Sequence, residues 1–412
     1  MTPQLNLSPK LIEQLQFVKR HSPYYQHLFS QCPISIEQIQ HVHDFKRVPL
    51  TTKNDFATHH FDFYTINTES ILEYCTTSGT TGSPLTVGLN QSDLDRLCNN
   101  EKFTFELAGV NKNDVVQLML TLDKQFMAGL AYLSGLRAIG CAVVRSGPGS
   151  PAFQLESIIR HRVTVLVAVP SFLIKIIDYA KQNNIKLEEL SVQKVICIGE
   201  PIRDENLSPN FLAQRISEAW NIELYSTYAS SEMQTAFSEC SKMCGVHLNE
   251  DLIYAEVLDD DGNEVSDGEC GELVITHIGV SGMPLVRYQT GDIVSKYIST
   301  CECGLSSMRL GPVIGRKNQL LKINGTSVFP AAIITLLKKY ELADIIIIAT
   351  KNYLYQHDVS ILLVGNSNLK QQIERDIKDR LKVKIELVFT DNESILKWRK
   401  PDNRKPEQII FV

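Results

Sequence analysis

The sequence predicts an α/β protein with a large, multi-layer N-terminal α/β domain at residues 1–315 and a small α+β C-terminal domain at residues 316–412. A length of 412 residues allows more than one domain with its own core. Between residues 110 and 315, short apolar runs alternate with helical stretches, which is typical of βαβ units and a largely parallel sheet. The pattern of predicted helices and strands changes near residues 315–319, which lie between two apolar stretches. We place the predicted domain boundary there.

The first predicted element is a helix over residues 8–31, with Ser8 as its N-cap and Pro9 in its first turn. Apolar runs then predict buried strands in the N-terminal domain, and these runs are 115–120, 142–144, 163–169 and 195–198. Pro170 and Gly199 follow two of them directly, at positions where parallel strands end and binding sites tend to form.

Residues 76–82 read Thr-Thr-Ser-Gly-Thr-Thr-Gly, with five hydroxyl side chains and two glycines. This composition disfavours helix and strand, and the apolar residues at 71–72 and 85–87 predict a strand–loop–strand unit. Glycine lets backbone N–H groups approach an anion, and the hydroxyls add donors. The loop therefore suits a triphosphate. A polar linker is the alternative, since the Gly-Lys-Ser/Thr of the common phosphate loop does not follow.

The C-terminal region alternates helices with strands, as expected for a small α+β domain. Its predicted elements are a helix near 330–340, strands at 345–348 and 357–364, a helix at 367–381, and strands at 383–389 and 409–412.

Composition excludes several classes of protein. Apolar residues make up 43% and charged residues 21% of the chain, as in ordinary globular proteins. A net charge of −6 gives no basic surface that would attract nucleic acid. The sequence has no run of 18 or more apolar residues, so no membrane-spanning helix is predicted. The N-terminus lacks the pattern of a signal peptide, so we expect a cytoplasmic protein whose ten cysteines are reduced or bind metal.

Several segments resemble the motifs of one enzyme family and follow one another in the same order. These segments are residues 18–25, 48–55, 76–82, 228–233, 271–276, 284–292, 315–316 and 325–330. Together they resemble the adenylate-forming superfamily of acyl-CoA synthetases, adenylation domains and luciferases. The resemblance is greatest to the phenylacetate–CoA ligase family and covers essentially the whole chain. It implies a nucleotide-binding N-terminal domain and a mobile C-terminal lid.

The resemblance also implies an ATP site. It places Thr77, Ser78, Gly79, Thr80, Thr81 and Gly82 around the phosphates and Gly199, Glu200 and Pro201 beside the adenine. It places Asp292 at the ribose, and it adds Tyr228, Ser231 and Arg316 to the same ATP site. Glu232 is the implied magnesium ligand, and carboxylate oxygens are ligands that Mg²⁺ prefers. Taken alone, such a Glu is usually a solvated carboxylate, and residues 199–201 could equally be a turn that ends a strand.

The family places a catalytic lysine near its C-terminus, in a Gly-Lys-x-x-Arg setting. Lys405 lies at the matching distance before the last strand, although Arg404 and Gln408 replace the flanking residues. Lys400 is the competing candidate, and an exposed basic tail is the alternative to both. Asn318 is the implied hinge, where the family has an Asp pair.

Cysteines form a second constellation. Cys240, Cys244 and His247 lie close together, and Cys301 and Cys303 follow later, which predicts a structural zinc site. The resemblance favours Cys240 and His247 with Cys301 and Cys303, and Cys244 is the alternate. Buried free thiols beside a surface histidine are the other interpretation.

The predicted activity is that of an acid–thiol ligase. ATP would adenylate a carboxylic acid, of aryl or arylacetic type, and coenzyme A would accept the acyl group. Phe126, Tyr132 and Ala229 are candidates for the acyl pocket, although core packing explains them equally well. An enzyme that serves a carrier protein or an amine, and a degenerate nucleotide-binding protein, are the rivals. A homodimer is a candidate assembly.

Overall fold

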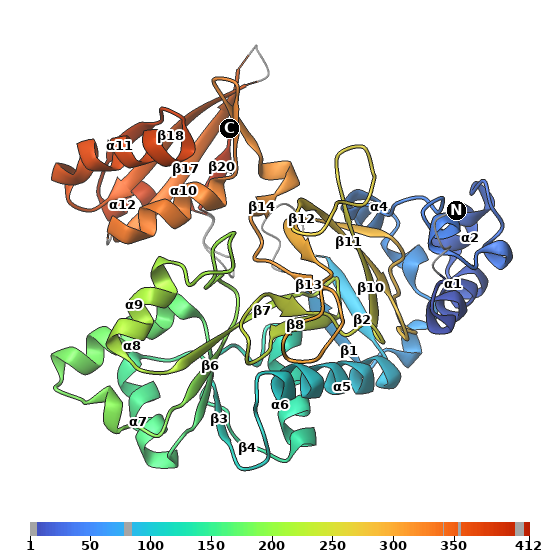
Figure 1. Ribbon diagram of the computed structural model, residues 1–412, viewed down its shortest axis with the longest axis horizontal. Coiled ribbons are helices and arrows are strands. Elements are labelled where there is room, and N and C mark those ends of the chain that lie inside the picture. Colours follow the sequence, from blue (N-terminus) through green and yellow to red (C-terminus); the bar gives the residue numbers. More distant parts are fainter. Residues whose placement is uncertain (1–5, 78–84, 341, 353–355, 400–407) are drawn as a thin grey trace. The chain divides into compact units, whose positions relative to one another are not determined.

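The computed structural model describes residues 6–77, 85–340, 342–352, 356–399 and 408–412 (Figure 1). Contacts divide the chain into two compact units. The larger unit holds the described residues up to Pro312 except Gly291–Ile293, and the smaller unit holds that segment and the described residues from Val313 onward. The division therefore falls close to the boundary predicted between residues 315 and 316.

The N-terminal helical region contains α1 (Pro9–His21) and α2 (Pro23–Ser30). Ser8 caps α1 as expected, because its hydroxyl accepts a hydrogen bond from the Leu11 amide at 3.2 Å. The prediction of one helix over residues 8–31 is wrong, because the first helix ends at His21 and a second begins after Ser22. A residue before proline is disfavoured in the α region, and Ser22 is extended and caps the second helix instead.

A mixed sheet forms the centre of the larger unit (Figure 1). Its parallel half contains, in spatial order, β4 (Ala142–Val144), β3 (Val115–Leu118), β5 (Val165–Ala168), β6 (Lys194–Cys197) and β7 (Glu223–Ser230). The connecting helices are α6 (Met127–Ile139), α7 (Pro151–His161), α8 (Pro170–Gln182) and α9 (Phe211–Ala219). The four strands predicted from apolar runs are confirmed.

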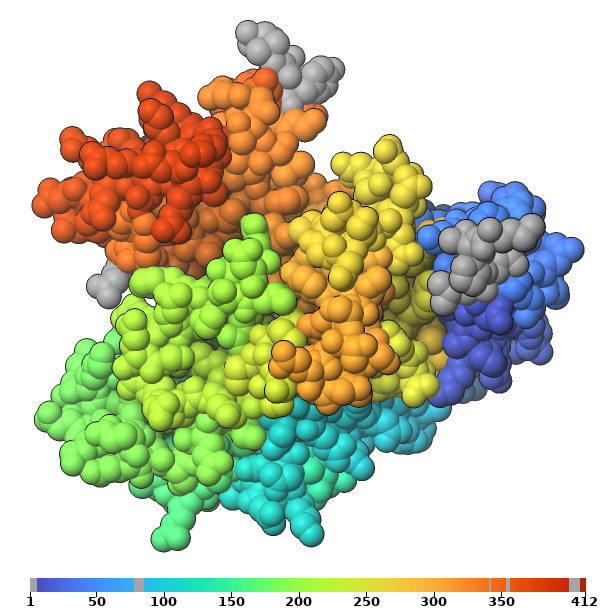
Figure 2. Space-filling model, viewed as in Figure 1, coloured from blue at the N-terminus to red at the C-terminus, as the bar shows by residue number. Residues whose placement is uncertain are grey.

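The continuous apolar runs reflect burial on both faces of this half-sheet. Leu166 and Ala168 of β5 pack in one core with α7, α8 and α9. Val165 and Val167 of the same strand pack in another core with α6 and α5 (Gln91–Leu107). Successive side chains point to opposite faces, so a strand covered on both sides needs apolar residues at every position. This region is the green and cyan surface in Figure 2.

The other half of the sheet is antiparallel. It contains, in spatial order, β8 (Thr235–Glu239), β9 (Val246–His247), β13 (Arg309–Leu310), β12 (Tyr288–Tyr297), β11 (Cys270–His277) and β10 (Ile253–Leu258). The prediction of a largely parallel sheet through residue 315 is therefore wrong for this half. Within the fully described stretch 220–315 no helix connects the strands, and a parallel crossover requires such a connection.

The smaller unit contains a sheet in the order β19 (Glu386–Phe389), β18 (His357–Val364), β17 (Asp344–Lys351), β20 (Ile409–Phe411). Helices α10 (Pro330–Leu337) and α11 (Lys370–Leu381) share one apolar core with this sheet. The helices and strands predicted for this region are present. A hairpin of β15 (Leu321–Ile323) and β16 (Thr326–Val328), and helix α12 (Asn392–Leu396), were not predicted.

Among the described residues, no helix combines the length and the apolar character needed to cross a membrane.

Candidate functional site

The carboxyl edge of the parallel strands brings together two predicted nucleotide-binding segments. Strands β6 and β7 are parallel neighbours, and their last pair in register is Cys197↔Ser226. Gly199 and Tyr228 each lie two residues beyond this pair. The Thr227 hydroxyl donates to the Cys197 carbonyl at 2.8 Å and ties the two strand ends together. Ligands of open α/β sheets bind at this edge, so the placement suits a nucleotide.

The side chain of Glu200 has a structural partner. Its Oε2 accepts a hydrogen bond from the Ser171 amide at 2.9 Å, in the first turn of α8. Val169, at the N-cap position, offers no side-chain cap, so Glu200 supplies an acceptor from another segment. Gly199, with φ of +73°, and Pro201 are exposed beside it. The Pro201 carbonyl accepts a hydrogen bond from the Asn210 side-chain amide at 2.8 Å, so residues 199–201 are held in place at the end of β6.

The base of the Ser/Thr/Gly loop is closed by two strands. Strands β1 (Glu73–Thr76) and β2 (Thr86–Leu89) pair antiparallel, which confirms the predicted strand–loop–strand unit. Beyond them the Thr77 amide donates to the Leu85 carbonyl at 2.9 Å, and the Leu85 amide donates to the Thr77 hydroxyl at 3.0 Å. Ser78, Gly79, Thr80, Thr81 and Gly82 lie outside the described residues.

The same base is joined to the parallel sheet. The Thr76 amide donates to the Gln125 carbonyl at 3.0 Å, and Gln125 belongs to the segment that follows β3. Lys124 and Gln125 both have positive φ, at +55° and +56°. This backbone conformation is uncommon outside glycine and is typical of tight connections and functional loops. The base of the loop is therefore tied to the connection between β3 and α6.

Glu232 lies in the turn between β7 and β8, and its side chain is 13% exposed. The Lys53 ammonium lies 3.8 Å from its Oε1. Lys53 is the first residue of α4 (Lys53–Thr58), which Thr52 and Asp55 fix with a reciprocal capping box. No role was predicted for Lys53, although it lies in segment 48–55, which resembles a motif of the family. Ser231 lies in the same turn, where its carbonyl accepts from the Gln234 amide at 3.3 Å.

Asp292 and Arg316, both in the smaller unit, lie side by side. Strand β14 (Gly315–Arg316) pairs with β12 in the register Asp292↔Arg316, and Arg316 Nε lies 3.2 Å from Asp292 Oδ1. Asp292 is 7% exposed, so its carboxylate is held in place by its neighbours. The predicted hinge residue Asn318 follows in a 3-10 turn, Lys317–Gln319.

The three candidates for the acyl pocket lie in different environments. Tyr132 is buried in the core, with its ring edge-on to Phe105 at 5.5 Å between centroids. Burial, and then the nearby Glu101, raises the pKa of Tyr132, so the phenol stays neutral. Phe126 is half-buried at the N-cap of α6, and Ala229 is exposed in β7. Packing of α5 against α6 accounts for Tyr132.

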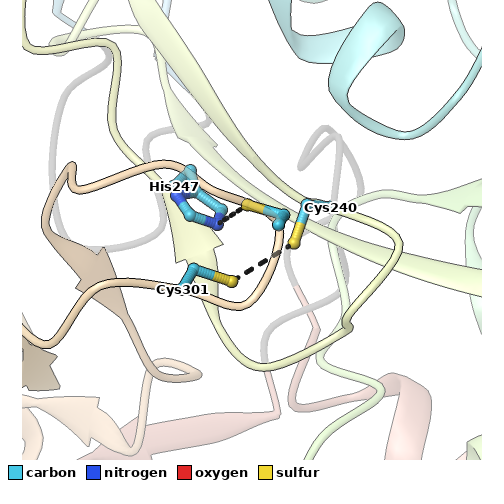
Figure 3. A group of neighbouring side chains, drawn as sticks. Cys240, His247 and Cys301 are labelled. Atoms are coloured by element: carbon cyan, nitrogen blue, oxygen red, sulfur yellow. Dashed lines mark hydrogen bonds between the residues drawn. The ribbon is translucent and has the colours of Figure 1, made fainter.

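Cys240, His247, Cys301 and Cys303 converge in the antiparallel half. Figure 3 labels the first three of them. Their ligand atoms all lie within 4.8 Å of one another, with Cys240 Sγ 3.7 Å from Cys301 Sγ and Cys303 Sγ 3.6 Å from His247 Nε2. Ligands about 2.3 Å from a tetrahedral zinc ion lie roughly 3.8 Å apart, so the spacing fits such an ion.

The surroundings of this cluster suit a metal ligand set. His247 Nδ1 is 3.0 Å from the Ser307 hydroxyl, which leaves Nε2 directed at the thiols. Burial, and then the Arg309 charge, lowers the pKa of His247 to about 4, so the imidazole is neutral, as a ligand must be. Cys244 Sγ is 3.5 Å from Cys301 Sγ but only 3.1 Å from Arg309 Nη1. Arg309 therefore engages the alternate thiol.

Lys405 and Lys400 both lie outside the described residues. Strand β20, which follows them, is present and pairs parallel with β17 at Ile347↔Ile409. The closing strand used to position Lys405 is thus confirmed, while the role of the lysine stays a prediction.

A model of the AMP-binding enzyme family matches residues 29–283. The chain belongs to this family. The predicted membership of the adenylate-forming superfamily, with greatest resemblance to phenylacetate–CoA ligases, is confirmed.

Curated relatives of this AMP-binding enzyme are phenylacetate-coenzyme A ligases. The protein of Thermus thermophilus is 27% identical over 79% of this chain and 72% of its own length. The protein of Pseudomonas putida is 27% identical over 78% and 73%, and that of Escherichia coli is 24% identical over 80% and 75%.

Solved structures confirm the fold class. A 2-hydroxyisobutyryl-CoA ligase in its postadenylation state superposes with a TM-score of 0.83 at 19% identity, over 98% of this chain and 88% of that one. The o-succinylbenzoate CoA synthetase of Bacillus subtilis gives 0.61 at 18% identity, over 81% and 67%. At these identities the likeness establishes the α/β adenylate-forming fold alone.

Proposed function

We propose that this AMP-binding enzyme is an AMP-forming acyl-CoA ligase. It adenylates a carboxylic acid with ATP, releases pyrophosphate, transfers the acyl group to coenzyme A and releases AMP. The proposal is supported mainly by the parallel pairing of β6 with β7, which brings residues 199–201 close to Tyr228. The Thr76–Gln125 hydrogen bond also joins the base of the loop at 77–82 to the segment that follows β3. The similarity to phenylacetate-coenzyme A ligases over most of both chains supports this reaction class.

In the first half-reaction the carboxylate attacks the α-phosphorus of ATP, and pyrophosphate leaves. The loop at 77–82 cradles the phosphates, Asp292 accepts hydrogen bonds from the ribose hydroxyls, and Glu232 is the ligand for Mg²⁺. A bound Mg²⁺ would neutralise charge on the phosphate oxygens. Lys53, 3.8 Å from Glu232, positions the carboxylate in the turn. Lys405 stabilises the charge that develops between the acid and the phosphate.

In the second half-reaction the thiol of coenzyme A attacks the acyl carbonyl, and the bond to AMP breaks. The adenylate oxygen keeps the electron pair, and the thiol loses its proton. We assign residues 1–315 as the adenylation domain and 316–412 as a lid that rotates about Asn318 between the two steps. The acid is of aryl or arylacetic type, with Phe126, Tyr132 and Ala229 near it, and the enzyme works in the cytoplasm.

The first test is pyrophosphate exchange into ATP, screened over aryl, arylacetic and short aliphatic acids. The exchange reports acyl-adenylate formation without any thiol. We expect exchange that depends on an acid and on Mg²⁺, strongest with an aryl or arylacetic acid. Failure with every acid would contradict the proposal and favour a degenerate nucleotide-binding protein.

The proposal includes a structural zinc ion held by Cys240, His247, Cys301 and Cys303. Three thiolates and a neutral imidazole suit Zn²⁺, and all four atoms lie within 4.8 Å of one another. The ion would link the segment at 240–247 to the segment at 301–303, which are far apart in the chain.

We expect the protein purified without chelator to carry close to one zinc ion per chain, as measured by metal analysis. Ligation contributes to the free energy of folding, so Cys301→Ser should lower zinc content and the unfolding temperature before it lowers the rate at low temperature. Cys270→Ser, at an exposed cysteine outside the cluster, is the matched control and should change neither. Wild-type protein without zinc would count against the site.

A further inference from the structure

The turn between β7 and β8, residues 231–234, is held by a buried arginine of α5. Arg96 is 6% exposed. Its Nη1 donates to the Gln234 carbonyl at 2.6 Å, and its Nη2 donates to the Thr235 hydroxyl at 3.1 Å. Glu232 precedes both acceptors in the chain. A single guanidinium therefore fixes one end of the turn that carries the proposed magnesium ligand.

The other donors of Arg96 reach the adjoining ends of two strands. Its Nε donates to the Ile278 carbonyl at 2.8 Å, directly after β11, and its Nη2 also donates to the Leu252 carbonyl, directly before β10. The Leu252 carbonyl accepts from the Ile278 amide as well, at 2.9 Å. Because β10 and β11 are paired along their whole length, Arg96 ties the turn to a firmly held edge of the sheet.

A buried arginine needs compensation for the loss of water around its charge. Burial lowers the pKa of Arg96 to about 10, and Asp93, one turn earlier in α5, acts in the opposite direction. The guanidinium therefore stays charged at neutral pH. An apolar side chain could pack α5 against β8 without burying a charge, so the arginine is explained by the oxygen atoms that it binds and not by helix packing.

Gln234 holds the same turn from within. Its side chain is 1% exposed, and Nε2 donates to the Met283 carbonyl at 3.1 Å. Its amide donates to the Ser231 carbonyl at 3.3 Å, and its φ is +46°. A residue other than glycine keeps such a conformation only where its surroundings determine it, and the bond from Arg96 to the Gln234 carbonyl is one of these determinants.

His277, the last residue of β11, lies beside the same turn. Its side chain is fully buried, and Nδ1 accepts from the Leu285 amide at 3.0 Å, so the proton of the neutral ring is on Nε2. Burial, and then the Arg96 charge, lowers the pKa of His277 to about 3, while the backbone of Glu232 and Met233 acts in the opposite direction. A neutral imidazole thus lies against the backbone that carries Glu232.

We propose that Arg96 is a positioning residue for Glu232. It acts through the backbone of the turn, whereas Lys53 lies beside the carboxylate itself. This inference rests on the proposed function, because it assumes that Glu232 binds Mg²⁺. The position of such a group matters, since a displacement of about 1 Å can lower a rate about a hundredfold.

The test uses three variants of the full-length protein. Arg96→Lys keeps the charge and loses the planar fork that reaches several oxygen atoms at once. Thr235→Val removes one of these acceptors at nearly constant volume, and it carries the test if Arg96→Lys does not fold. The control is Gln154→Met in α7, which removes buried hydrogen bonds with Gln117 and the Gly147 carbonyl.

Two measurements are made on each variant. Pyrophosphate exchange is titrated with Mg²⁺, and binding of α,β-methylene-ATP is measured by calorimetry with and without Mg²⁺, so that one readout involves no turnover. We expect Arg96→Lys to lower exchange about tenfold, to raise the Mg²⁺ concentration for half-maximal exchange and to weaken the Mg²⁺-dependent part of analogue binding. Thr235→Val should have the same effects at about threefold, because one hydrogen bond is lost. Gln154→Met should lower the unfolding temperature and leave the Mg²⁺ dependence unchanged.

The Glu232→Gln background separates positioning from a general loss of stability. If Arg96 acts through Glu232, adding Arg96→Lys or Thr235→Val to Glu232→Gln should lower exchange by less than about twofold, since the two changes remove the same contribution. An equal fold-loss in both backgrounds would overturn the inference and leave the proposed function standing. An unchanged Mg²⁺ dependence in the folded variants of Arg96 and Thr235 would do the same. Near-normal exchange in Glu232→Gln alone would overturn the magnesium assignment and the inference together.

Discussion

Replacing Lys405 with alanine is expected to lower adenylation by roughly two to three orders of magnitude, the loss typical of one preorganised charge. The ammonium would contact the carboxylate and the α-phosphate only while the lid is closed for the first step. Thioester formation from supplied acyl-adenylate should therefore be nearly unchanged. Pyrophosphate exchange measures the first half-reaction, and single-turnover transfer to coenzyme A measures the second.

Lys400→Ala is the matched control for this prediction. It removes the same charge from the same tail, and both residues precede the strand that pairs with β17. We expect it to be almost silent in both half-reactions. If Lys400→Ala is the damaging change, or if Lys405→Ala lowers both half-reactions together, the position assigned to the catalytic lysine is wrong.

The second large effect is expected at Glu232. Glu232→Gln keeps the size of the side chain and removes the charge that would bind Mg²⁺, so adenylation should fall by about two orders of magnitude or more. The Mg²⁺ concentration needed for half-maximal exchange should rise as well. Lys53, 3.8 Å away, would lose its ion-pair partner in the same variant.

Two further variants separate the loss of the metal ligand from other consequences. Glu218→Gln makes the same chemical change at an exposed position of α9 and should leave exchange unchanged. Lys53→Gln removes the partner and keeps the carboxylate, so it should lower exchange less than Glu232→Gln does. Near-normal exchange in Glu232→Gln would rule out Glu232 as the magnesium ligand.

The parallel half of the sheet was predictable because burial on both faces leaves a clear signal. The runs at 115–120, 163–169 and 195–198 are apolar at nearly every position, and few other elements produce such runs. The antiparallel half gave no comparable signal. What distinguishes these antiparallel strands from the parallel ones is mainly how they are connected. The prediction of a parallel sheet assumed that helices and strands keep alternating beyond α9, but the alternation stops there.

The cysteine cluster was predictable from residue type and spacing, since few roles other than metal binding use three thiols and an imidazole. Contacts between residues distant in the chain were not. Lys53 meets Glu232 across most of the larger unit's sequence, and Glu200 caps α8 through Ser171. Neither partner is marked by periodicity or spacing, because such pairs depend on how the elements pack.

The most direct test of the central claim is the incubation of wild-type protein with ATP, Mg²⁺, coenzyme A and an acid that supports pyrophosphate exchange, with the products identified by mass spectrometry. We predict acyl-CoA and AMP in equal amounts. When coenzyme A or the acid is omitted, neither product should accumulate beyond a single turnover. Formation of ADP in place of AMP, or of acyl-adenylate that never passes its acyl group to coenzyme A, would contradict an AMP-forming acyl-CoA ligase.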